Sequence, residues 1–385
     1  MAAVAAGSGV TLGVEEEFLL VDPVTGATVP RAARVLARAG RHPLSSGTRF
    51  HPELASTQVE AATGVCTTLR SLRHQLREGR GRLAAAAAAE GARLVSTGTP
   101  VRPGPDPPPG PGERFARIRR MYAGVVAGYQ CCGCHVHVGV ADRETAVAVV
   151  NHLRPWLPTL LALSVNSPFD RGRDSGHASW RIVEQSRFPG AGVPPWSADA
   201  AEFDRRVQRL VDGGVLADPA MTFWLARPSP HLPTVEVRVA DAAGTVDEAV
   251  LQAALTRALV RRALWDLAAG RQAPRVDDQV CAAAVWSAAR YGLDGPGVHP
   301  LEGTAVPAMR LVKELMGRVR PALEESGDLA AVEAALARLR VVGTGAVRQR
   351  RAAAVNGTAG AAAMLIRQTA RPAWRAPERV GTARP

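Results

Sequence analysis

Three short segments of the chain alternate charged or imidazole side chains with residues that are mostly apolar. In a β-strand, residues i and i+2 point to the same face of the sheet. The two members of each pair would therefore share one face, while their apolar neighbours would share the other. The apolar faces fit a hydrophobic core, which leaves groups that can do chemistry on the opposite face. These pairs are Glu15 and Glu17, His135 and His137, and Glu236 and Arg238.

If the three strands are neighbours, five carboxylate or imidazole groups and one guanidinium meet on one sheet face. Carboxylates that lie so close repel one another and raise one another's pKa unless a cation neutralises them. Mg²⁺ prefers oxygen ligands in octahedral geometry and commonly shares its coordination shell with substrate phosphates. We therefore predict a magnesium–nucleotide site rather than a structural zinc site. The alternative is a solvated polar sheet face, although such faces seldom combine these three pairs.

Glu16 is the exception to the alternation, because it would point to the apolar face between Glu15 and Glu17. The only interpretation that the sequence offers for it is a contact at an edge of the sheet. Each pair is also a weak signal by itself, since a lone His-x-His or Glu-x-Glu is often structural. The prediction of a catalytic face depends on the three pairs occurring together.

The elements that must position these side chains follow from periodicity and turn residues. We predict strands at residues 10–21, 55–63, 93–97, 132–140 and 234–241, with a short extended piece at 222–225. We predict helices at residues 30–39, 67–92, 114–130, 143–154, 157–165 and 200–213, and mostly helical structure from 246 to 360. The Pro/Gly-rich stretch 100–112 and the polar stretch 167–196 are expected to be loops, either of which would help to close a site.

This order of elements indicates one α+β domain, because strands spread through the first part of the chain and helices follow them. We expect residues 1–370 to form a single catalytic domain. Residues 371–385 are rich in Pro and Arg and are expected to be a disordered tail.

The net charge of +12 suggests nucleic-acid binding at first sight, but the distribution of the charge argues against it. Lys313 is the only lysine, the arginines are scattered along the chain, and aromatic residues make up only 4%. A nucleic-acid interface usually gathers basic residues on one face or stripe. We therefore expect no nucleic-acid partner. With so little lysine, the chain also lacks a glycine-rich loop ending in Gly-Lys-Ser/Thr and offers almost no candidate for Schiff-base chemistry.

The sequence shows no segment typical of a membrane span or of an export signal. No uncharged apolar run approaches the roughly 18–20 residues that a membrane span needs. The first residues have no basic region of the kind that opens a signal peptide. We expect a cytoplasmic protein that does not bind a membrane.

The five cysteines include a cluster, Cys131-Cys132-Gly133-Cys134, which runs into His135. An odd number of cysteines without an export signal argues against a disulfide framework. The cluster resembles a zinc motif, but no second Cys/His pair lies at a matching distance, and adjacent side chains of a strand point to opposite faces. We expect the cysteines to be small buried hydrophobic residues.

The chain resembles the carboxylate–amine ligase family, the type 2 glutamate–cysteine ligases, over about residues 10 to 360. The His-Val-His-Val-Gly and Thr-Val-Glu-Val-Arg-Val motifs are specific when they occur together. The blocks that carry the resemblance are 13–18, 58–63, 133–139 and 227–241, with further similar segments at 161–168 and 176–181.

This resemblance implies a glutamine-synthetase-like fold, in which a curved antiparallel sheet binds ATP, metal ions and the acceptor carboxylate on its concave face. Helices would pack on the convex side. The implied Mg²⁺ ligands are Glu15, Glu17, Glu53, Glu60, His135 and Glu236. The implied catalytic residues are Arg238, Arg227 and His137, and the implied nucleotide-binding residues are His137, Arg238 and Arg181. The partners would be a small-molecule carboxylate, an amine and a second copy of the chain in a homodimer.

The resemblance also implies a reaction, the formation of an amide by way of an acyl phosphate. One stretch departs from the family: where many relatives read Asn-Arg-Trp-Arg-Ala-Ala-Arg, this chain has Ala284-Val285-Trp286-Ser287-Ala288-Ala289-Arg290. An amide and two guanidinium groups are lost, and Thr344 replaces a common Asn. Several alternatives therefore stay open. The chain could have weak glutamate–cysteine ligase activity or could be a ligase that tailors a non-glutamate acid. It could also transfer a phosphoryl group without ligation, or bind a nucleotide or metabolite without catalysis.

Overall fold

The computed structural model describes residues 9–370, so the predicted tail at 371–385 lies outside the described residues. Its centre is a seven-stranded sheet in the order β10-β11-β5-β1-β3-β2, with β4 paired to the far end of β1. Every pairing in this sheet is antiparallel. The strands are β1 (Leu12–Val21), β2 (Arg49–Pro52), β3 (Gln58–Ala62), β4 (Arg93–Val95), β5 (Gly133–Gly139), β10 (Ala226–Pro228) and β11 (Thr234–Asp241).

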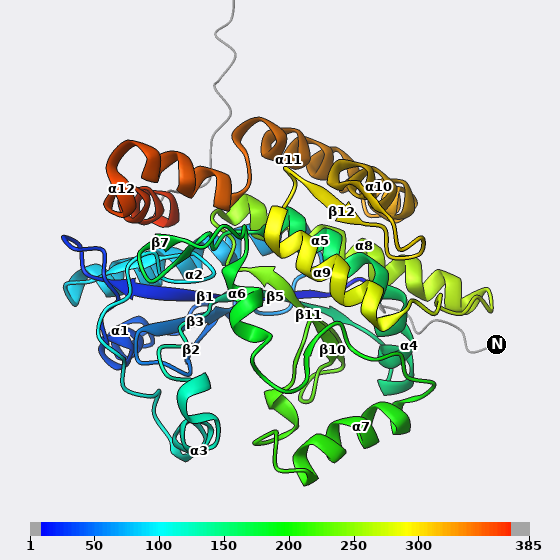
Figure 1. Cartoon of the computed structure of the whole chain (residues 1–385), viewed down its shortest axis with the longest axis horizontal. Helices are drawn as coiled ribbons and strands as arrows, with labels where there is room; N and C mark the ends of the chain where they lie inside the picture. Colours follow the sequence, from blue (N-terminus) through cyan, green and yellow to red (C-terminus); the bar gives the residue numbers. More distant parts are fainter. Residues whose placement is uncertain (1–8, 371–385) are drawn as a thin grey trace, which may run out of the picture.

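Helices surround this sheet, and Figure 1 shows the sheet between an upper group of helices and the lower helices α3 and α7. In the first half of the chain they are α1 (Ala32–Ala39), α2 (Leu69–Ala89), α3 (Glu113–Tyr122), α4 (Arg143–Leu153), α5 (Leu157–Ser164) and α6 (Trp180–Gln185). In the second half they are α7 (Ala200–Asp212), α8 (Val246–Ala268), α9 (Asp278–Tyr291), α10 (Ala308–Glu325), α11 (Leu329–Val342) and α12 (Gly345–Ala370), the last kinked at Asn356 and Gly357.

Short paired segments lie outside the main sheet. They are β6 (Phe169–Asp170) with β7 (Arg173–Asp174), β8 (Ala191–Gly192) with β9 (Phe223–Trp224), and β12 (Pro296–Val298) with β13 (Ala305–Pro307). Among the described residues, no helix is long and apolar enough to cross a membrane.

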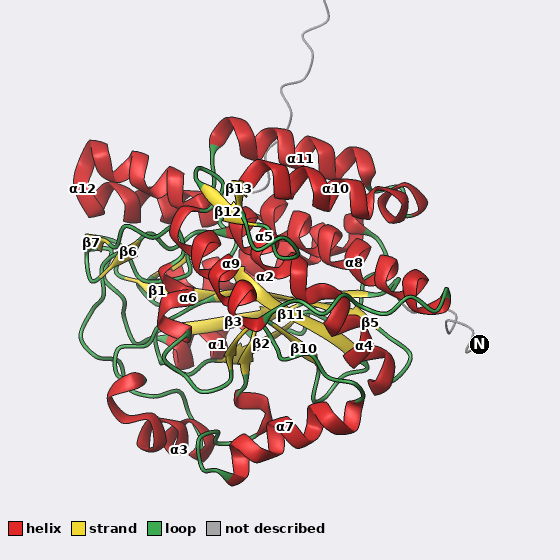
Figure 2. Ribbon diagram, turned by 45° about the vertical axis from the view of Figure 1, so that its right-hand side comes forward, coloured by secondary structure: helices red, strands yellow, loops and turns green. Residues whose placement is uncertain are grey.

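One face of the sheet is apolar and lies against helices α2, α4, α5 and α8 (Figure 2). Val14, Val136 and Val237 are buried there in one cluster with leucines such as Leu72 of α2 and Leu255 of α8. Since side chains alternate along each strand, burying the valines fixes which residues point to the other face. The packing of the core therefore orients the polar residues of β1, β5 and β11.

The helices behind the sheet begin at residues suited to that position. Thr245 precedes α8, where its hydroxyl accepts from the backbone N–H of Glu248 at 3.2 Å, and the Glu248 carboxylate accepts from the backbone N–H of Thr245 at 2.9 Å. This reciprocal arrangement satisfies backbone donors that a helix start leaves unpaired. Thr68 caps α2 by accepting from the backbone N–H of Ser71.

Glu16 is not at a sheet edge, so that interpretation is wrong. β1 lies between β5 and β3, and Glu16 points from it into the apolar side of the sheet, where it is only 2% exposed. Arg80 of α2 donates to both of its carboxylate oxygens, at 2.9 and 2.5 Å, and also to the backbone carbonyl of Ala243. The pair joins β1, α2 and the start of the α8 region within the core.

The predicted main strands at 10–21, 55–63, 93–97, 132–140 and 234–241 are confirmed, with ends a few residues shorter. β2 and β10 were not predicted, since each is short, contains a proline and lies at an edge of the sheet. The helix predicted at 114–130 ends at Tyr122, because Ala123 adopts a positive φ of 43° and a single 3₁₀ turn follows. The loop predicted at 167–196 contains α6.

Candidate active site

The strand register brings the three alternating pairs together on the face of the sheet that points away from α2, α4, α5 and α8. Glu15 lies opposite His135, and Glu236 lies opposite His137. On the other side of β1, Glu17 lies opposite Glu60 of β3. The prediction that these strands are neighbours and share one polar face is therefore confirmed.

A first group of potential cation ligands consists of Glu15, His135 and Glu236, whose ligand atoms all lie within 4.8 Å of one another. His135 Nδ1 is 3.3 Å from Glu15 Oε2. Burial opposes ionisation of Glu15, but hydrogen bonds and charge from His135 and His137 outweigh it and hold the pKa of Glu15 well below its usual range. This carboxylate is therefore charged at neutral pH.

A second group consists of Glu17, Glu53 and Glu60, again with ligand atoms within 4.8 Å of one another. Burial and the nearby charge of Glu17 raise the pKa of Glu53 to about 8. Burial and the charges of Glu15, Glu53 and Glu17 raise the pKa of Glu60 well above its usual value. Burial is the larger cause of both raised pKa values, and the convergence of three carboxylates adds to it.

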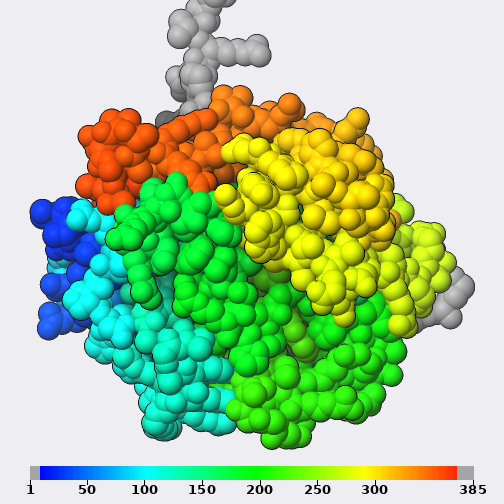
Figure 3. Space-filling view, viewed as in Figure 1, coloured from blue at the N-terminus to red at the C-terminus, as the bar shows by residue number. Residues whose placement is uncertain are grey.

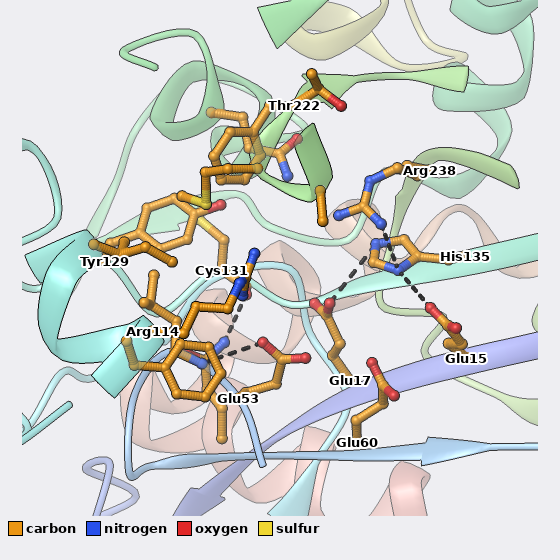
Figure 4. Close-up of a pocket in the computed structure, with 18 of the residues that line it drawn as sticks. Glu15, Glu17, Glu53, Glu60, Arg114, Tyr129, Cys131, His135, Thr222 and Arg238 are labelled. Carbon is orange, nitrogen blue, oxygen red and sulfur yellow. Dashed lines mark hydrogen bonds and ion pairs between the residues drawn. The ribbon is translucent and has the colours of Figure 1, made fainter. Parts of the chain in front are cut away.

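The two groups adjoin at His135, as Figure 4 shows. His135 Nε2 is 3.7 Å from Glu17 Oε1, while its Nδ1 faces Glu15. Burial and the neighbouring charge of Arg238 lower the pKa of His135. A neutral imidazole can offer a nitrogen lone pair to a cation, so this shift suits a metal ligand.

The residues of both groups fit a hard divalent cation. They supply five carboxylates and one imidazole, a set dominated by the oxygen donors that Mg²⁺ takes, and no cysteine thiolate. All five cysteines are free and buried, as expected, and burial raises the pKa of Cys131 well above its usual value. Burial and charge repulsion both raise the pKa values of Glu53 and Glu60, and a bound cation would offset both effects by favouring the ionised carboxylates.

Arg227 and Arg238 border the first group and form ion pairs with the same carboxylate. Arg227 Nε lies 2.8 Å from Glu236 Oε2, and Arg238 Nη1 donates to Glu236 Oε1. Burial opposes the ionisation of Glu236, but the two guanidinium charges hold its pKa well below the usual range. Arg238 also reaches His135, with 3.4 Å between Nη1 and Nδ1. Fixed positive charge therefore lies next to the predicted metal ligands.

His137 lies two residues after His135 in β5 and therefore points to the same face of the sheet. Its Nδ1 is 2.9 Å from the Thr234 hydroxyl, and its Nε2 is 3.2 Å from Glu15 Oε1. Burial lowers the pKa of His137, but the hydrogen bond to Glu15 and the charge of Glu236 raise it by more. His137 thus differs from His135 and can carry positive charge near neutral pH.

Arg181 was expected to contact the nucleotide, and the structure places it on the polar face but fully covered. It is 1% exposed and donates to the backbone carbonyls of Arg238 and Val239. It lies so close over Gly133 that a Cβ there would come within 2.5 Å of its guanidinium. In this structure Arg181 therefore joins α6 to β5 and β11.

A chamber of about 400 Å³ opens over this face, and Figure 4 shows its lining. Besides predicted residues, it includes Gln58, Arg114, Tyr129, Gln185 and His231. Gln58 precedes Glu60 by two positions in β3, so the alternation already indicated its direction. The other four come from α3, α6 and loops, where no sequence period identifies a lining residue.

The sheet and its polar face define a ligase fold of the glutamine-synthetase type, as the resemblance implied. A glutamate–cysteine ligase from Francisella tularensis, solved in complex with AMP, has a TM-score of 0.67 at 12% identity, over 93% of this chain and 88% of that one. A bifunctional glutathione synthetase from Pasteurella multocida has a TM-score of 0.69 at 14% identity, over 94% and 52%. At such identities the likeness concerns the fold alone.

Sequence similarity then defines the family. The profile of glutamate–cysteine ligase family 2 matches residues 11–372. A protein of Saccharopolyspora erythraea named "Putative glutamate--cysteine ligase 2-2" is 58% identical over 363 residues, which cover 94% of this chain and 93% of that protein. The chain therefore belongs to glutamate–cysteine ligase family 2, and this membership makes it an ATP-dependent ligase.

Proposed function

We propose that this ligase joins a small-molecule carboxylate to an amine, with ATP and Mg²⁺, by way of an acyl phosphate. The observation that carries the proposal is the pair of cation-ligand groups on one sheet face, with Arg227 and Arg238 beside them. Transfer of a phosphoryl group needs positioning and neutralisation of negative charge more than it needs covalent chemistry by the protein. Two sets of acidic ligands and two arginines supply both requirements.

The proposed reaction has two steps. An oxygen of the substrate carboxylate attacks the γ-phosphorus of ATP, and the bond from that phosphorus to the β-phosphate oxygen breaks, which gives an acyl phosphate and ADP. The amine nitrogen then attacks the acyl carbon and loses a proton, while the bond to the phosphate oxygen breaks. The products are an amide and inorganic phosphate.

The side chains of the polar face would have different roles in these two steps. Glu15, His135 and Glu236 would hold one cation, and Glu17, Glu53 and Glu60 would hold another. Bound Mg²⁺ supplies positive charge that neutralises phosphate oxygens. Arg238 and Arg227 would orient phosphate or carboxylate groups, a task suited to a planar, bidentate guanidinium. His137, which can carry charge, would contact the phosphates.

The test is the release of ADP with and without Mg²⁺, acid and amine, followed by mass spectrometry of the product. Glutamate with cysteine is the first pair to try, because the relatives carry that name. An amide ligase releases ADP and phosphate and forms the amide only when all components are present. A kinase would form ADP without an amide, and a protein that only binds nucleotide would form neither, so either result would contradict the proposal.

A further inference from the structure

A second chamber, of about 710 Å³, lies beside the polar chamber and has the opposite character. It is formed by α6, the segment that leads to β8, and α9, and Figure 3 shows the surface hollowed where the green and yellow parts of the chain meet. Its apolar walls include Ile182, Phe188, Leu225, Cys281, Val285 and Trp286. The chamber is as large as many small-molecule sites.

The second chamber has few polar groups. No lysine or arginine is among the described residues that line it, and Asp278 is the one carboxylate there. Asp278 is already paired with the buried guanidinium of Arg154. A polar head group such as the ammonium and α-carboxylate of an amino acid would lose its hydration there without a matching partner. An apolar group would gain from the same surroundings.

Gln185 lines both chambers, which therefore adjoin at this residue. It is buried, and its side-chain amide interacts with the phenol of Tyr129, which lines the polar chamber. Arg181 lies one helical turn before Gln185 on α6 and covers Gly133 beside His135. The metal face and the second chamber therefore lie on either side of this helix, with Gln185 as a lining residue that they share.

Trp286 gives the second chamber a flat aromatic wall. It is 55% exposed, an unusual amount for so large an apolar side chain. Its ring is held by edge contacts with His177 and Tyr291, at centroid distances of 6.3 and 6.1 Å. An ordered, partly exposed indole is well placed to pack against a flat ligand group.

We infer that the carboxylate substrate carries an apolar, flat side group, about the size of an aromatic ring, that lies in the second chamber while its carboxylate lies at the metal face. This inference rests on the proposed ligase reaction. The acid, rather than the amine, is the substrate that stays in place through both steps, first as carboxylate and then as acyl phosphate. A group attached to it can therefore be bound throughout.

Two neighbouring alanines of α9 offer a matched test. Ala282 and Ala283 are both exposed, but only Ala282 lines the second chamber. Ala282→Phe would fill part of the chamber, whereas Ala283→Phe places the same ring outside it. Both variants are compared with the unchanged chain for ADP release from acetate, glutamate, phenylacetate and 3-phenylpropanoate, each with a panel of amines that includes aromatic ones. Binding of the same acids is measured separately by equilibrium dialysis in Mg²⁺ and a non-hydrolysable ATP analogue.

The aryl acids are expected to bind at least tenfold more tightly than acetate, and Ala282→Phe is expected to remove at least tenfold of that affinity. Ala283→Phe should behave like the unchanged chain. If ADP forms from glutamate and Ala282→Phe changes nothing, the ligase reaction stands and this inference is wrong. If aryl acids bind in a manner that depends on Ala282 but no acid yields ADP, the reaction is wrong and the chamber assignment stands. A dependence on Ala282 only for aromatic amines would overturn the assignment to the acid.

Discussion

At the scale of single residues, the two groups of potential cation ligands on the polar face differ in the charges that surround them. Glu15 and Glu236 have neighbours that neutralise them, because two histidines and two arginines lie against them. Glu53 and Glu60 have mainly other carboxylates as neighbours, and their pKa values are raised. A cation bound among the second group therefore relieves more repulsion than one bound among the first. The affinity of the second group for Mg²⁺ should consequently depend on pH.

We predict that Mg²⁺ stabilises the protein more strongly as the pH rises from about 4.5 to about 8, the window set by the raised pKa of Glu53. Without metal, the folded protein keeps a proton that the unfolded chain has already lost, so the free energy of unfolding falls as the pH rises through this window. For one proton the slope is at most about 1.4 kcal/mol per pH unit. Thermal unfolding with Mg²⁺ and with a chelator across this range measures the difference. Glu60→Gln should flatten it, and an equal pH dependence in both conditions would contradict the prediction.

Glu236→Gln should lower the rate of ADP formation by about a hundredfold or more, since it removes a cation ligand and the partner of two buried arginines. The rate is measured under saturating ATP, with circular dichroism to check folding. Glu333→Gln, on the exposed surface of α11, is the control and should leave the rate unchanged. Full activity in Glu236→Gln would show that the site is assigned wrongly.

Most of the polar face could be predicted from the sequence, because alternation in a strand depends only on neighbouring residues. Glu15, Glu17, His135, His137, Glu236 and Arg238 all lie where their spacing indicated. Glu53 lies just after β2, outside any alternating pair, and was found only through the family resemblance. The covered position of Arg181 also could not be predicted, because it depends on how α6 packs over Gly133.

At the scale of elements, long strands and helices were predictable and short edge strands were not. β1 and β5 carry enough alternating residues to define a strand, whereas β2 has four residues and β10 has three. Edge strands bury little surface, so their sequences lack a clear apolar face. The role of Glu16 was missed for a related reason, since its partner Arg80 lies 64 positions away in α2.

Arg80→Ala should destabilise the fold by about 3–5 kcal/mol, because it leaves the Glu16 carboxylate buried without its partner. Chemical denaturation measures the free energy of unfolding. Arg73→Ala, on the same helix, breaks a more exposed pair with Asp247 and should cost at most about 1 kcal/mol. A double change, Glu16→Gln with Arg80→Met, should recover part of the loss. Equal effects of Arg80→Ala and Arg73→Ala would refute a structural role for the buried pair.

At the scale of the whole molecule, the site depends on contacts between segments far apart in the sequence. The second chamber joins α6 to α9, about a hundred positions later, and no local pattern predicts such a meeting. The structure also shows where the residues around Trp286 that differ from the family lie. Ala284 and Ser287 are buried, with the Ser287 hydroxyl bonded to the Pro296 carbonyl, whereas Val285 and Trp286 line the second chamber. If the second chamber binds the side group of the acid, as proposed, substrate choice depends on how α6 and α9 are held together.

Asp241 anchors α6 to the sheet and should act on both chambers through that contact. It is fully buried, and its carboxylate accepts from the Ser179 hydroxyl at 2.8 Å, the Ser167 hydroxyl at 2.7 Å and the backbone N–H of Asn166 at 2.7 Å. Ser179 directly precedes α6, which carries Gln185 at its end. Loss of the contact between Asp241 and Ser179 should displace Gln185, which lines both chambers. Asp241 is thus a positioning residue.

Asp241→Ala should lower the free energy of unfolding by about 3–5 kcal/mol, because three donors lose a buried acceptor. Ser179→Ala removes one of these bonds and should cost about 1 kcal/mol, which keeps a folded protein for kinetics. In that variant the KM for the acid should rise several-fold while the KM for ATP stays nearly constant, since α6 lines both chambers but carries none of the proposed metal ligands. Asp204→Ala, in an exposed pair with Arg143, is the control and should change neither constant. Equal rises in both KM values for Ser179→Ala would mean that the anchor supports the whole sheet and not the α6 wall in particular.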